Sequence, residues 1–207
     1  MRLSNLLEFK GERKEMFELL APWYDKIRKF IGSGEVKEIT REIKKLEKNK
    51  QKPLKVLDVG GGTGKYWEVD SLGGVDLYLL DRSKSMLNES RSETIPIQGD
   101  VHSLPFEDGF FDVVVCIDAL HHFEDRITSL KEMERISKIG TCIFVADFDP
   151  DHLLTNIISA GEIVLGEPGK FIKTEKLDDF FEKRGHETEK IDLASYFYLF
   201  KSEKLVD

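Results

Sequence analysis

The chain has 207 residues and a formal net charge of -8, which leaves room for one domain with a full hydrophobic core but is short for two. The acidic balance argues against a general nucleic-acid binder, because such proteins need a clustered positive field, although a local basic patch stays open. No apolar run is long enough to cross a bilayer, and charges interrupt the N-terminus, so we expect a cytoplasmic protein without a membrane span.

Two features of the composition bear on stability and on redox chemistry. Lys and Glu are abundant and Gln is rare, which favours a heat-adapted, thermophilic source. Cys116 and Cys142 both lie inside apolar runs and have no partner at metal-ligand spacing. We therefore expect buried structural thiols and no metal site.

The N-terminal part of the chain is predicted to be helical and polar. Apolar residues recur at helical spacing on either side of a break at residues 31–34. The stretch after the break carries one apolar stripe, formed by Val36, Ile39, Ile43 and Leu46. This stripe is expected to pack on the body of the domain.

Five short β-rich runs follow from residue 54, and most of them end in an acid: LKVLDV, DLYLLD, TIPIQGD, DVVVCID and TCIFVAD. Apolar runs without alternation are buried on both faces, so we expect a mainly parallel sheet with helices on either side. Helices are predicted within SKSMLNES, RITSLKEMERISK and TEKLDDFFEKRG. The last two runs, ETEKIDL and SYFYLFKSE, are close enough in sequence to form an antiparallel pair.

The turn after the first predicted strand, VLDVGGGTGKY, is rich in glycine. Gly60, Gly62 and Gly64 alternate with other residues, and Asp58 precedes the first of them by two positions. A bare backbone lets a ligand approach closely, because no Cβ intervenes and positive φ costs little at glycine. The dinucleotide fingerprint G-x-G-x-x-G would need glycine or alanine at Lys65, so the motif is D-x-G-x-G-x-G instead.

Two further carboxylates follow predicted strands. Asp81 ends the second strand, near the usual distance at which an acid accepts hydrogen bonds from ribose hydroxyls, and Asp100 ends the third. Because Arg82 follows Asp81 and is positively charged, the charge pattern alone does not exclude a ligand with a 2′-phosphate on its ribose. Each acid taken singly is equally well explained as a helix cap or a turn residue. Because parallel strands end at the same edge of a sheet, the three acids together predict a ligand site there.

These stretches, together with GDVHSLPFEDGFFDVVVCIDALHHF and YFYLFKS, resemble the motifs of class I S-adenosylmethionine-dependent methyltransferases. The resemblance is greatest to the branch that includes the ubiquinone and menaquinone C-methyltransferases, and it runs from about residue 17 to the C-terminus. It implies a Rossmann-like, doubly wound α/β fold. The expected sheet is mainly parallel and seven-stranded, with an antiparallel C-terminal strand and an N-terminal helical decoration.

The same resemblance implies one domain over residues 1–207. Residues 1–52 are expected to form an N-terminal helical cap and residues 53–150 a cofactor-binding core. Residues 151–207 are expected to form an acceptor-side insertion, the last helix and the final strands. The stretch from Gly64 to Asp76 is shorter than the first crossover usual in the family, so we expect a truncated helix there.

S-adenosylmethionine is the cofactor that the resemblance implies. Gly60 and Gly62 would lie under its methionine part, with Asp58 at the floor of that site. Asp81 would hold the ribose and Asp100 the adenine amino group. Further contacts are implied for the backbone of Arg82, Val101 and Ile117, and for Tyr24 in APWYD, which would close over the cofactor or, nearly as well, pack between helices.

Candidate catalytic residues follow the fourth strand. IDALHHF places Asp118, His121 and His122 at the edge toward which the methyl group is expected to point. Histidine titrates near neutrality, so His121 is a candidate general base, although the family often carries such a pair without using it. Asp118 would orient the cofactor or cap the next helix, and His122 is expected to be a hydrogen-bonded core residue. The other histidines are expected at solvated loop positions, namely His102, His152 and His186.

The leading interpretation is an S-adenosylmethionine-dependent methyltransferase that acts on a small, apolar or lipid-like acceptor. Residues 147–177 would line the acceptor pocket or, equally well, pack in the core or at a homodimer contact. One alternative is an RNA (tRNA) methyltransferase that uses the lysines of residues 44–52, although a solvated helix face explains that run better. A non-catalytic cofactor-binding regulatory or assembly protein and a nicotinamide oxidoreductase are the others.

Overall fold

The computed structural model describes residues 33–48, 52–68, 72–153, 155, 158–159, 169–194 and 196–205. Seven strands form one sheet in the order β3-β2-β1-β4-β5-β7-β6. The strands are Leu54–Val59 (β1), Val75–Asp81 (β2), Ile95–Gln98 (β3), Phe111–Ile117 (β4), Ser137–Phe148 (β5), His186–Ala194 (β6) and Phe197–Lys204 (β7). The helices are Ser33–Glu47 (α2), Lys84–Asn88 (α3), Arg126–Ile136 (α4) and Thr174–Glu182 (α6), with a 3₁₀ turn at Leu120–His122 (η2).

The sheet confirms the predicted fold class. Strands β1 to β5 run parallel to one another, whereas β7 lies between β5 and β6 and is antiparallel to both. The strand order reverses between β1 and β4. In open α/β sheets the crevice beyond the carboxyl ends of such strands is the usual place for a ligand. The predicted antiparallel pair of late strands is confirmed as β6 and β7.

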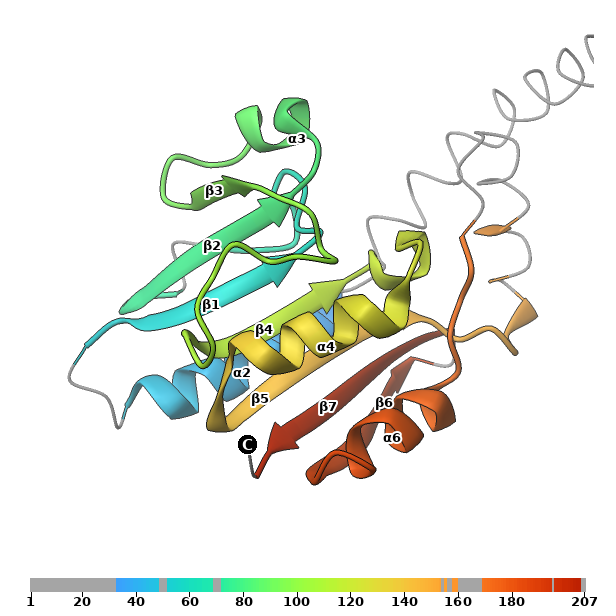
Figure 1. Cartoon of the computed structure of the whole chain (residues 1–207). Helices are drawn as coiled ribbons and strands as arrows, with labels where there is room; N and C mark the ends of the chain where they lie inside the picture. Colours follow the sequence, from blue (N-terminus) through green and yellow to red (C-terminus); the bar gives the residue numbers. More distant parts are fainter. Residues whose placement is uncertain are drawn as a thin grey trace, which may run out of the picture.

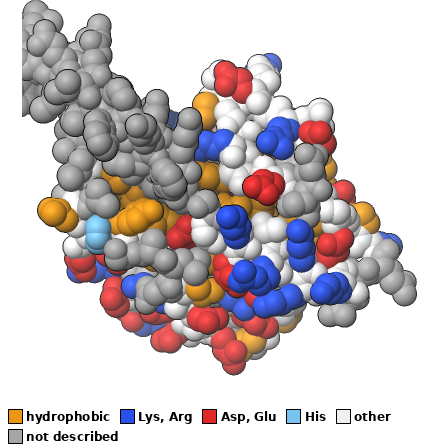
Figure 2. All heavy atoms as spheres, turned by 180° about the vertical axis from the view of Figure 1, so that it is seen from behind, with side chains coloured by type: hydrophobic (Ala, Val, Ile, Leu, Met, Phe, Trp, Pro, Cys, Tyr) orange, Lys and Arg blue, Asp and Glu red, His pale blue; other side chains and the backbone are white. Residues whose placement is uncertain are grey.

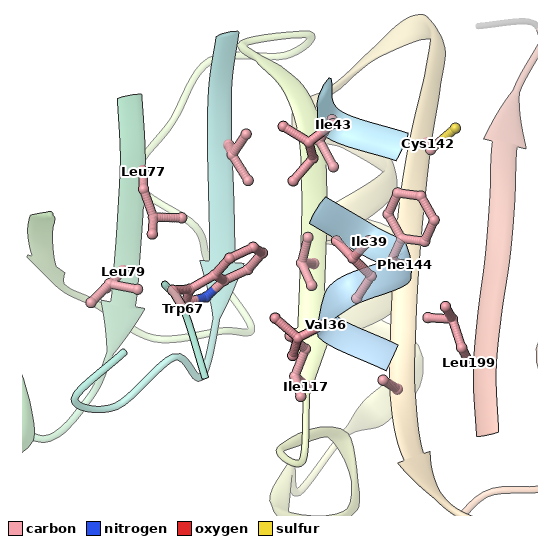
Figure 3. Close-up of a cluster of buried hydrophobic side chains, with 14 of the residues drawn as sticks. Val36, Ile39, Ile43, Trp67, Leu77, Leu79, Ile117, Cys142, Phe144 and Leu199 are labelled. Carbon is pink, nitrogen blue, oxygen red and sulfur yellow. The ribbon is translucent and has the colours of Figure 1, made fainter. Parts of the chain in front are cut away.

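Helices cover both faces of the sheet (Figure 1): α4 and α6 lie on one face and α2 on the other. β4 is buried along its whole length, as expected of an apolar run without alternation. On the α2 face the core contains the expected stripe, since Val36, Ile39 and Ile43 are buried in one cluster with Phe144 (Figure 3). The predicted apolar face of the second N-terminal helix is therefore confirmed. Tyr24 and the first predicted helix lie outside the described residues.

The connection between β1 and β2 has turns and no helix in its described residues, 60–68 and 72–74. This agrees with the expected truncation of the first crossover. Trp67 is only 1% exposed and belongs to the same buried cluster as the α2 stripe. Trp67 thus covers part of the face of β1 and β2 that a crossover helix would cover, and α2 packs beside it in the same cluster, over β4 and β5 (Figure 3).

The expected loop position of His186 is wrong. His186 does not lie in a solvated loop but begins β6, where it is 5% exposed. Its Nδ1 lies 2.7 Å from Ser202 Oγ, and its ring packs against Phe181. Because β6 begins directly after Gly185, the His186 side chain lies on the sheet face that α6 covers and is buried there.

The surface carries charges of both signs. Figure 2, which views the molecule from behind, shows Lys and Arg side chains among Asp and Glu side chains. On α2, Arg41 pairs with Glu38 and Lys45 pairs with Glu42. Among the described residues, no helix combines the length and apolar character that a bilayer crossing needs.

Candidate functional site

The glycine loop leaves β1 at the point where the strand order reverses. The amides of Gly60 and Gly61 both donate to Leu80 O, over 2.8 and 3.1 Å, so the loop is fastened to the end of β2. Gly60, Gly62 and Gly64 all have positive φ, between 55° and 77°. A Cβ on Gly60 would stand 2.7 Å from Ala119 Cβ, closer than real side chains approach. The sequence therefore needs glycine here for conformation and for space.

Asp81 lies against this loop. Its Oδ2 accepts a hydrogen bond from Gly62 N at 3.0 Å, and its Oδ1 accepts one from Ser83 N at 2.8 Å. A carboxylate has about four acceptor positions, so the two amides orient the group and leave positions for a ligand's hydroxyls. The side chain is half-buried at the end of β2. This geometry suits a group that holds a diol.

Asp58 is the most buried of the three acids, at 1% exposure. Its Oδ2 accepts a hydrogen bond from Trp67 Nε1 at 2.7 Å, whereas its buried Oδ1 has no hydrogen-bond partner among the described residues. Burial raises the pKa of Asp58 to about 7; the Trp67 hydrogen bond opposes this rise and the charge of Asp81 adds to it. The carboxylate is therefore placed to receive a cation.

Asp100 lies at the exposed end of the same edge and belongs to a small network. Its Oδ1 accepts a hydrogen bond from His102 N at 2.9 Å and lies 2.7 Å from His102 Nδ1. Because His102 Nε2 accepts from Asp125 N at 3.2 Å, the ring proton belongs on Nδ1. The hydrogen bonds from His102 lower the pKa of Asp100. His102 is thus half-buried in a network that links Asp100 to Asp125, the N-cap of α4.

His121 and Asp147 form a buried pair where β4 and β5 end. His121 Nδ1 lies 2.7 Å from Asp147 Oδ1, and His121 N donates to Asp147 Oδ2 at 3.1 Å. Neither side chain is exposed to solvent. The His121 ring also packs on Phe171, with ring centroids 4.7 Å apart. A carboxylate that accepts a hydrogen bond from one ring nitrogen of a histidine keeps the proton on that nitrogen. The other ring nitrogen then carries the lone pair that can accept a proton.

The expected burial of His122 is wrong. His122 is exposed, and it is His121 that is buried and hydrogen-bonded. The two residues end the 3₁₀ turn η2, in which successive side chains point about 120° apart. One of the two therefore faces the acid of β5 while the other faces outward, with ring centroids 4.0 Å apart.

Asp118 joins the glycine loop to the end of β4. Its Oδ2 accepts a hydrogen bond from Tyr66 Oη at 2.5 Å and lies 3.9 Å from Lys65 Nζ. Its backbone has φ 54°, a conformation uncommon for a residue other than glycine. The alternative role as a helix cap is wrong, because Ala119 precedes η2 and Asp125 caps α4.

The described part of the chain contains one grouping with the composition of a metal site, although none was expected from the sequence. Ligand atoms of Asp118, His121 and Asp147 lie within 4.8 Å of one another. Each of these side chains already has a hydrogen-bond partner, Tyr66 for Asp118 and the other member of the buried pair for His121 and Asp147. The arrangement is therefore satisfied as a hydrogen-bonded network.

Three residues of the site were missed by the sequence analysis: Tyr66, Trp67 and Asp147. Asp147 ends the run TCIFVAD, so the rule that selected the other strand-end acids also applies to it. Tyr66 and Trp67 follow the last glycine of the loop, where a crossover helix would ordinarily begin. An aromatic pair in an unusually short crossover was the available signal. The remaining expected contacts behave as ordinary backbone: Arg82 O accepts from Gln98 Nε2 at 3.1 Å, and Ile117 is buried at the end of β4.

Comparison with known proteins identifies the relatives of this chain. Residues 57–145 match a protein-family model described as a methyltransferase domain. A demethylmenaquinone methyltransferase of Renibacterium salmoninarum is 33% identical over 154 residues, which cover 72% of this chain and 63% of the relative. A ubiquinone/menaquinone biosynthesis C-methyltransferase of Chromobacterium violaceum is 30% identical over 153 residues, covering 68% of this chain and 62% of the relative. The chain therefore spans about three fifths of the length of these relatives.

The fold also has close counterparts among solved structures. A Thermotoga maritima S-adenosylmethionine-dependent methyltransferase, described as a possible histamine N-methyltransferase, gives a TM-score of 0.65. The match covers 92% of this chain and 99% of that chain at 20% sequence identity. At this identity the likeness establishes the fold.

Proposed function

Because the chain belongs to the class I S-adenosylmethionine-dependent methyltransferases, we propose that it transfers a methyl group to a small, apolar or lipid-like acceptor, at an activated ring carbon. Its relatives are quinone-biosynthesis C-methyltransferases. One observation carries the proposal: the bare glycine loop and its three carboxylates lie at the same sheet edge as the buried His121–Asp147 pair. Such an edge offers a place for a nucleoside beside a place for proton transfer.

The residues of the loop fit the cofactor. A nucleoside with a cationic amino-acid end needs a backbone that it can approach, an acceptor for its ribose hydroxyls and a negative group for its ammonium. Gly60 and Gly62 supply the backbone and Asp81 the acceptor for the ribose. Asp58 supplies the negative group, and its Oδ1 has no hydrogen-bond partner among the residues that the structure describes. Asp100 would receive the adenine amino group, with Arg82, Val101 and Ile117 contributing backbone and Tyr24 closing the site. These assignments rest on the family motifs and on the chemistry of the groups.

S-adenosylmethionine supplies an electrophilic methyl carbon on a positively charged sulfur. Alignment and exclusion of water are then the main tasks of the protein. Asp118, held by Tyr66 and near Lys65, would border the acceptor and keep the end of β4 at a constant distance from the glycine loop.

His121 would act as general base. Asp147 holds the Nδ1 proton, so the Nε2 lone pair would take the proton that the acceptor loses as its new bond to carbon forms. The imidazolium would be stabilised by the Asp147 carboxylate, which the buried setting makes effective. His122, exposed beside it, would pass the proton to water.

An apolar aromatic acceptor suits the surroundings of this base. Phe148 and Phe171 pack around the His121 ring, with centroids 6.2 and 4.7 Å away. An acidic hydroxyl or ring carbon of an aromatic acceptor would meet a dry, aromatic wall here. The same proposal divides the chain into a cap at 1–52, a cofactor-binding core at 53–150, and an acceptor-side insertion, last helix and final strands at 151–207. It also includes a homodimer and a cytoplasmic, heat-adapted setting.

The test is methyl transfer from labelled S-adenosylmethionine by the full chain. The acceptor panel contains reduced naphthoquinols and phenols with and without an apolar tail, and bulk tRNA. We expect transfer to the tailed quinols, with kcat lowered 10² to 10⁴-fold in His121→Gln and at least tenfold in Asp147→Asn, and with unchanged cofactor affinity. His186→Gln is the matched histidine control: His186 begins β6 at the opposite edge of the sheet, so this variant should keep full activity.

Other results of this assay would favour one of the alternative functions. Transfer to tRNA alone would favour the RNA enzyme. Cofactor binding without transfer to any acceptor would favour a regulatory or assembly protein. A chain with no affinity for S-adenosylmethionine or S-adenosylhomocysteine would contradict the proposal.

A further inference from the structure

The indole of Trp67 occupies the position that the short crossover leaves empty. Figure 3 shows it beside Leu79 of β2, in a layer that continues through Ile39 and Val36 of α2. Its carbon atoms fill the core on this face, and its exposure is 1%. The polar end of the ring, Nε1, therefore needs an acceptor inside the protein. That acceptor is Asp58, the first acid of the glycine-loop motif.

Two neighbours fix the place of the Asp58 carboxyl group. Trp67 Nε1 donates to Oδ2 at 2.7 Å. The backbone of Gly61 lies against the same group, because an added Cβ there would be 2.9 Å from both Cγ and Oδ2 of Asp58. The hydrogen bond from Trp67 thus holds the carboxyl group in a position that is available only because residue 61 has no side chain. The second oxygen, Oδ1, is buried and has no hydrogen-bond partner in the described part of the chain.

The charges around this carboxyl group do not neutralise it. Asp81, on the neighbouring strand β2, disfavours its ionised form, and the Cys116 thiol on β4 lies close enough to feel its charge. Within the described residues, no lysine, arginine or histidine shifts Asp58. Burial consequently raises the pKa of Asp58 to about 7. A ligand with a positively charged group would supply the counter-charge that the described residues around Asp58 do not provide.

We propose that Trp67 is a positioning residue that presents Asp58 to the cofactor, and that capture of the cofactor's amino-acid ammonium drives a proton off this carboxyl group. The inference rests on the proposed function, because it requires the amino-acid end of S-adenosylmethionine to lie over the glycine loop. In this role Trp67 orients Asp58 from the short connection between β1 and β2, where a longer crossover would place a helix. It also makes cofactor capture respond to pH near neutrality.

The direction of the effect follows from the charges. Below pH 7 the carboxyl group of the free protein is mostly protonated, and an ammonium ion favours the ionised form. Binding must then release a proton, so affinity falls as the pH is lowered, by up to about tenfold per pH unit. Trp67→Phe keeps the aromatic volume but removes the hydrogen bond that favours ionisation. The fall in affinity should therefore begin at a higher pH in this variant.

The experiment is isothermal titration calorimetry of the full chain with S-adenosylhomocysteine between pH 5.5 and 8.5. S-adenosylhomocysteine keeps the ammonium and carries no transferable methyl group. Methylthioadenosine, which lacks the amino-acid end, is the matched ligand. We expect wild-type affinity for S-adenosylhomocysteine to rise with pH and level off above pH 7, with about one proton released at pH 6 in buffers of different ionisation enthalpy. Methylthioadenosine should bind with the same affinity throughout.

Variants separate the role of Trp67 from general stability. In Trp67→Phe the rise should shift upward by at least half a pH unit and affinity at pH 7 should drop three- to tenfold, and in Asp58→Asn the profile should be flat. Wild-type proton release keeps the proposal testable should Trp67→Phe fail to fold. A second readout is the fluorescence of Trp67 in a Trp23→Phe background, which should change with the same midpoint.

Each outcome has a clear meaning. Parallel pH profiles for the two ligands, or an unshifted profile in a folded Trp67→Phe protein, would overturn this inference and leave the proposed function intact. Absence of binding by both ligands would overturn both.

Discussion

Tyr66 Oη donates a hydrogen bond to Asp118 Oδ2 over 2.5 Å and thereby ties the end of the glycine loop to the end of β4. The two residues belong to segments that border the crevice from opposite sides of the switch point. Asp118 holds a left-handed backbone conformation, with φ 54°, which costs of order 1 kcal/mol and needs support from its surroundings. The tyrosine hydroxyl is one such support, and it comes from the loop that would carry the cofactor.

Replacing Tyr66 by Phe should therefore affect catalysis more than folding. A hydrogen bond to a charged group contributes about 1.5–3 kcal/mol, and part of this would be recovered by water at a half-buried site. We expect a fall of less than 1.5 kcal/mol in the free energy of unfolding and at least a tenfold fall in kcat. Tyr78→Phe is the control, because Tyr78 packs in an aromatic cluster with Phe106 and Phe111. Equal kcat values in the Tyr66→Phe and Tyr78→Phe variants would contradict a role of Tyr66 in catalysis.

The glycine loop allows conformational strain to be separated from close approach. Gly60 and Gly140 have similar positive φ values, 77° and 70°, but an added Cβ at Gly60 would meet Ala119 at 2.7 Å whereas one at Gly140 has nothing within 4 Å. Gly140→Ala should cost about 1 kcal/mol of stability from backbone strain alone. Gly60→Ala should cost clearly more and should weaken S-adenosylhomocysteine binding at least tenfold. Denaturant unfolding and calorimetry measure the two effects, and similar losses in both variants would contradict the close approach.

Asp58 should make the ligand-free protein less stable as the pH rises. Its folded-state pKa of about 7 lies above the usual value of 3.8, so between these values the folded protein keeps a proton that the unfolded chain has lost. The free energy of unfolding then decreases as pH rises through this window, by up to about 4 kcal/mol for a shift of roughly three units.

The variant Asp58→Asn has no such charge to bury. In urea unfolding, the stability gain of the variant over wild type should grow by about 2–3 kcal/mol between pH 5 and pH 8, because wild type loses that much stability over this range. A variant less stable than wild type at pH 8 would mean that an unseen positive group compensates Asp58.

Much of the fold could be predicted because its signals are local. Buried parallel strands appear as short apolar runs, and the acids that end them mark one edge of the sheet, so Asp58, Asp81 and Asp100 could be assigned to that edge. The length of the short crossover between the first two strands could be read directly from the number of residues between them. The family resemblance implied an antiparallel C-terminal strand, whereas the position of β7 between β5 and β6 was not predicted and is seen in the structure.

The side-chain partners could not be predicted in the same way. The directions of Tyr66 and Trp67 depend on positive φ values at three alternate residues, Gly60, Gly62 and Gly64, and a turn of this kind follows neither helical nor strand periodicity. The burial of His122 was wrongly expected because a 3₁₀ turn, rather than a strand or an α-helix, determines which of the two neighbouring histidines faces Asp147. His186 was misplaced because the strand begins directly after Gly185, without an intervening loop.

His186 should make the protein sensitive to acid. Burial lowers its pKa below the usual 6.5, and nearby Glu134 only partly opposes this effect. As the pH falls below about 6.5 the unfolded chain binds a proton before the folded protein does, so stability is lost with falling pH. His186→Gln can keep the hydrogen bond with Ser202 and cannot titrate, so its stability should fall less between pH 7 and pH 5. Urea unfolding at both values measures the difference. His152→Gln is the control and should follow wild type, and a His186→Gln protein as acid-sensitive as wild type would assign the effect to other groups.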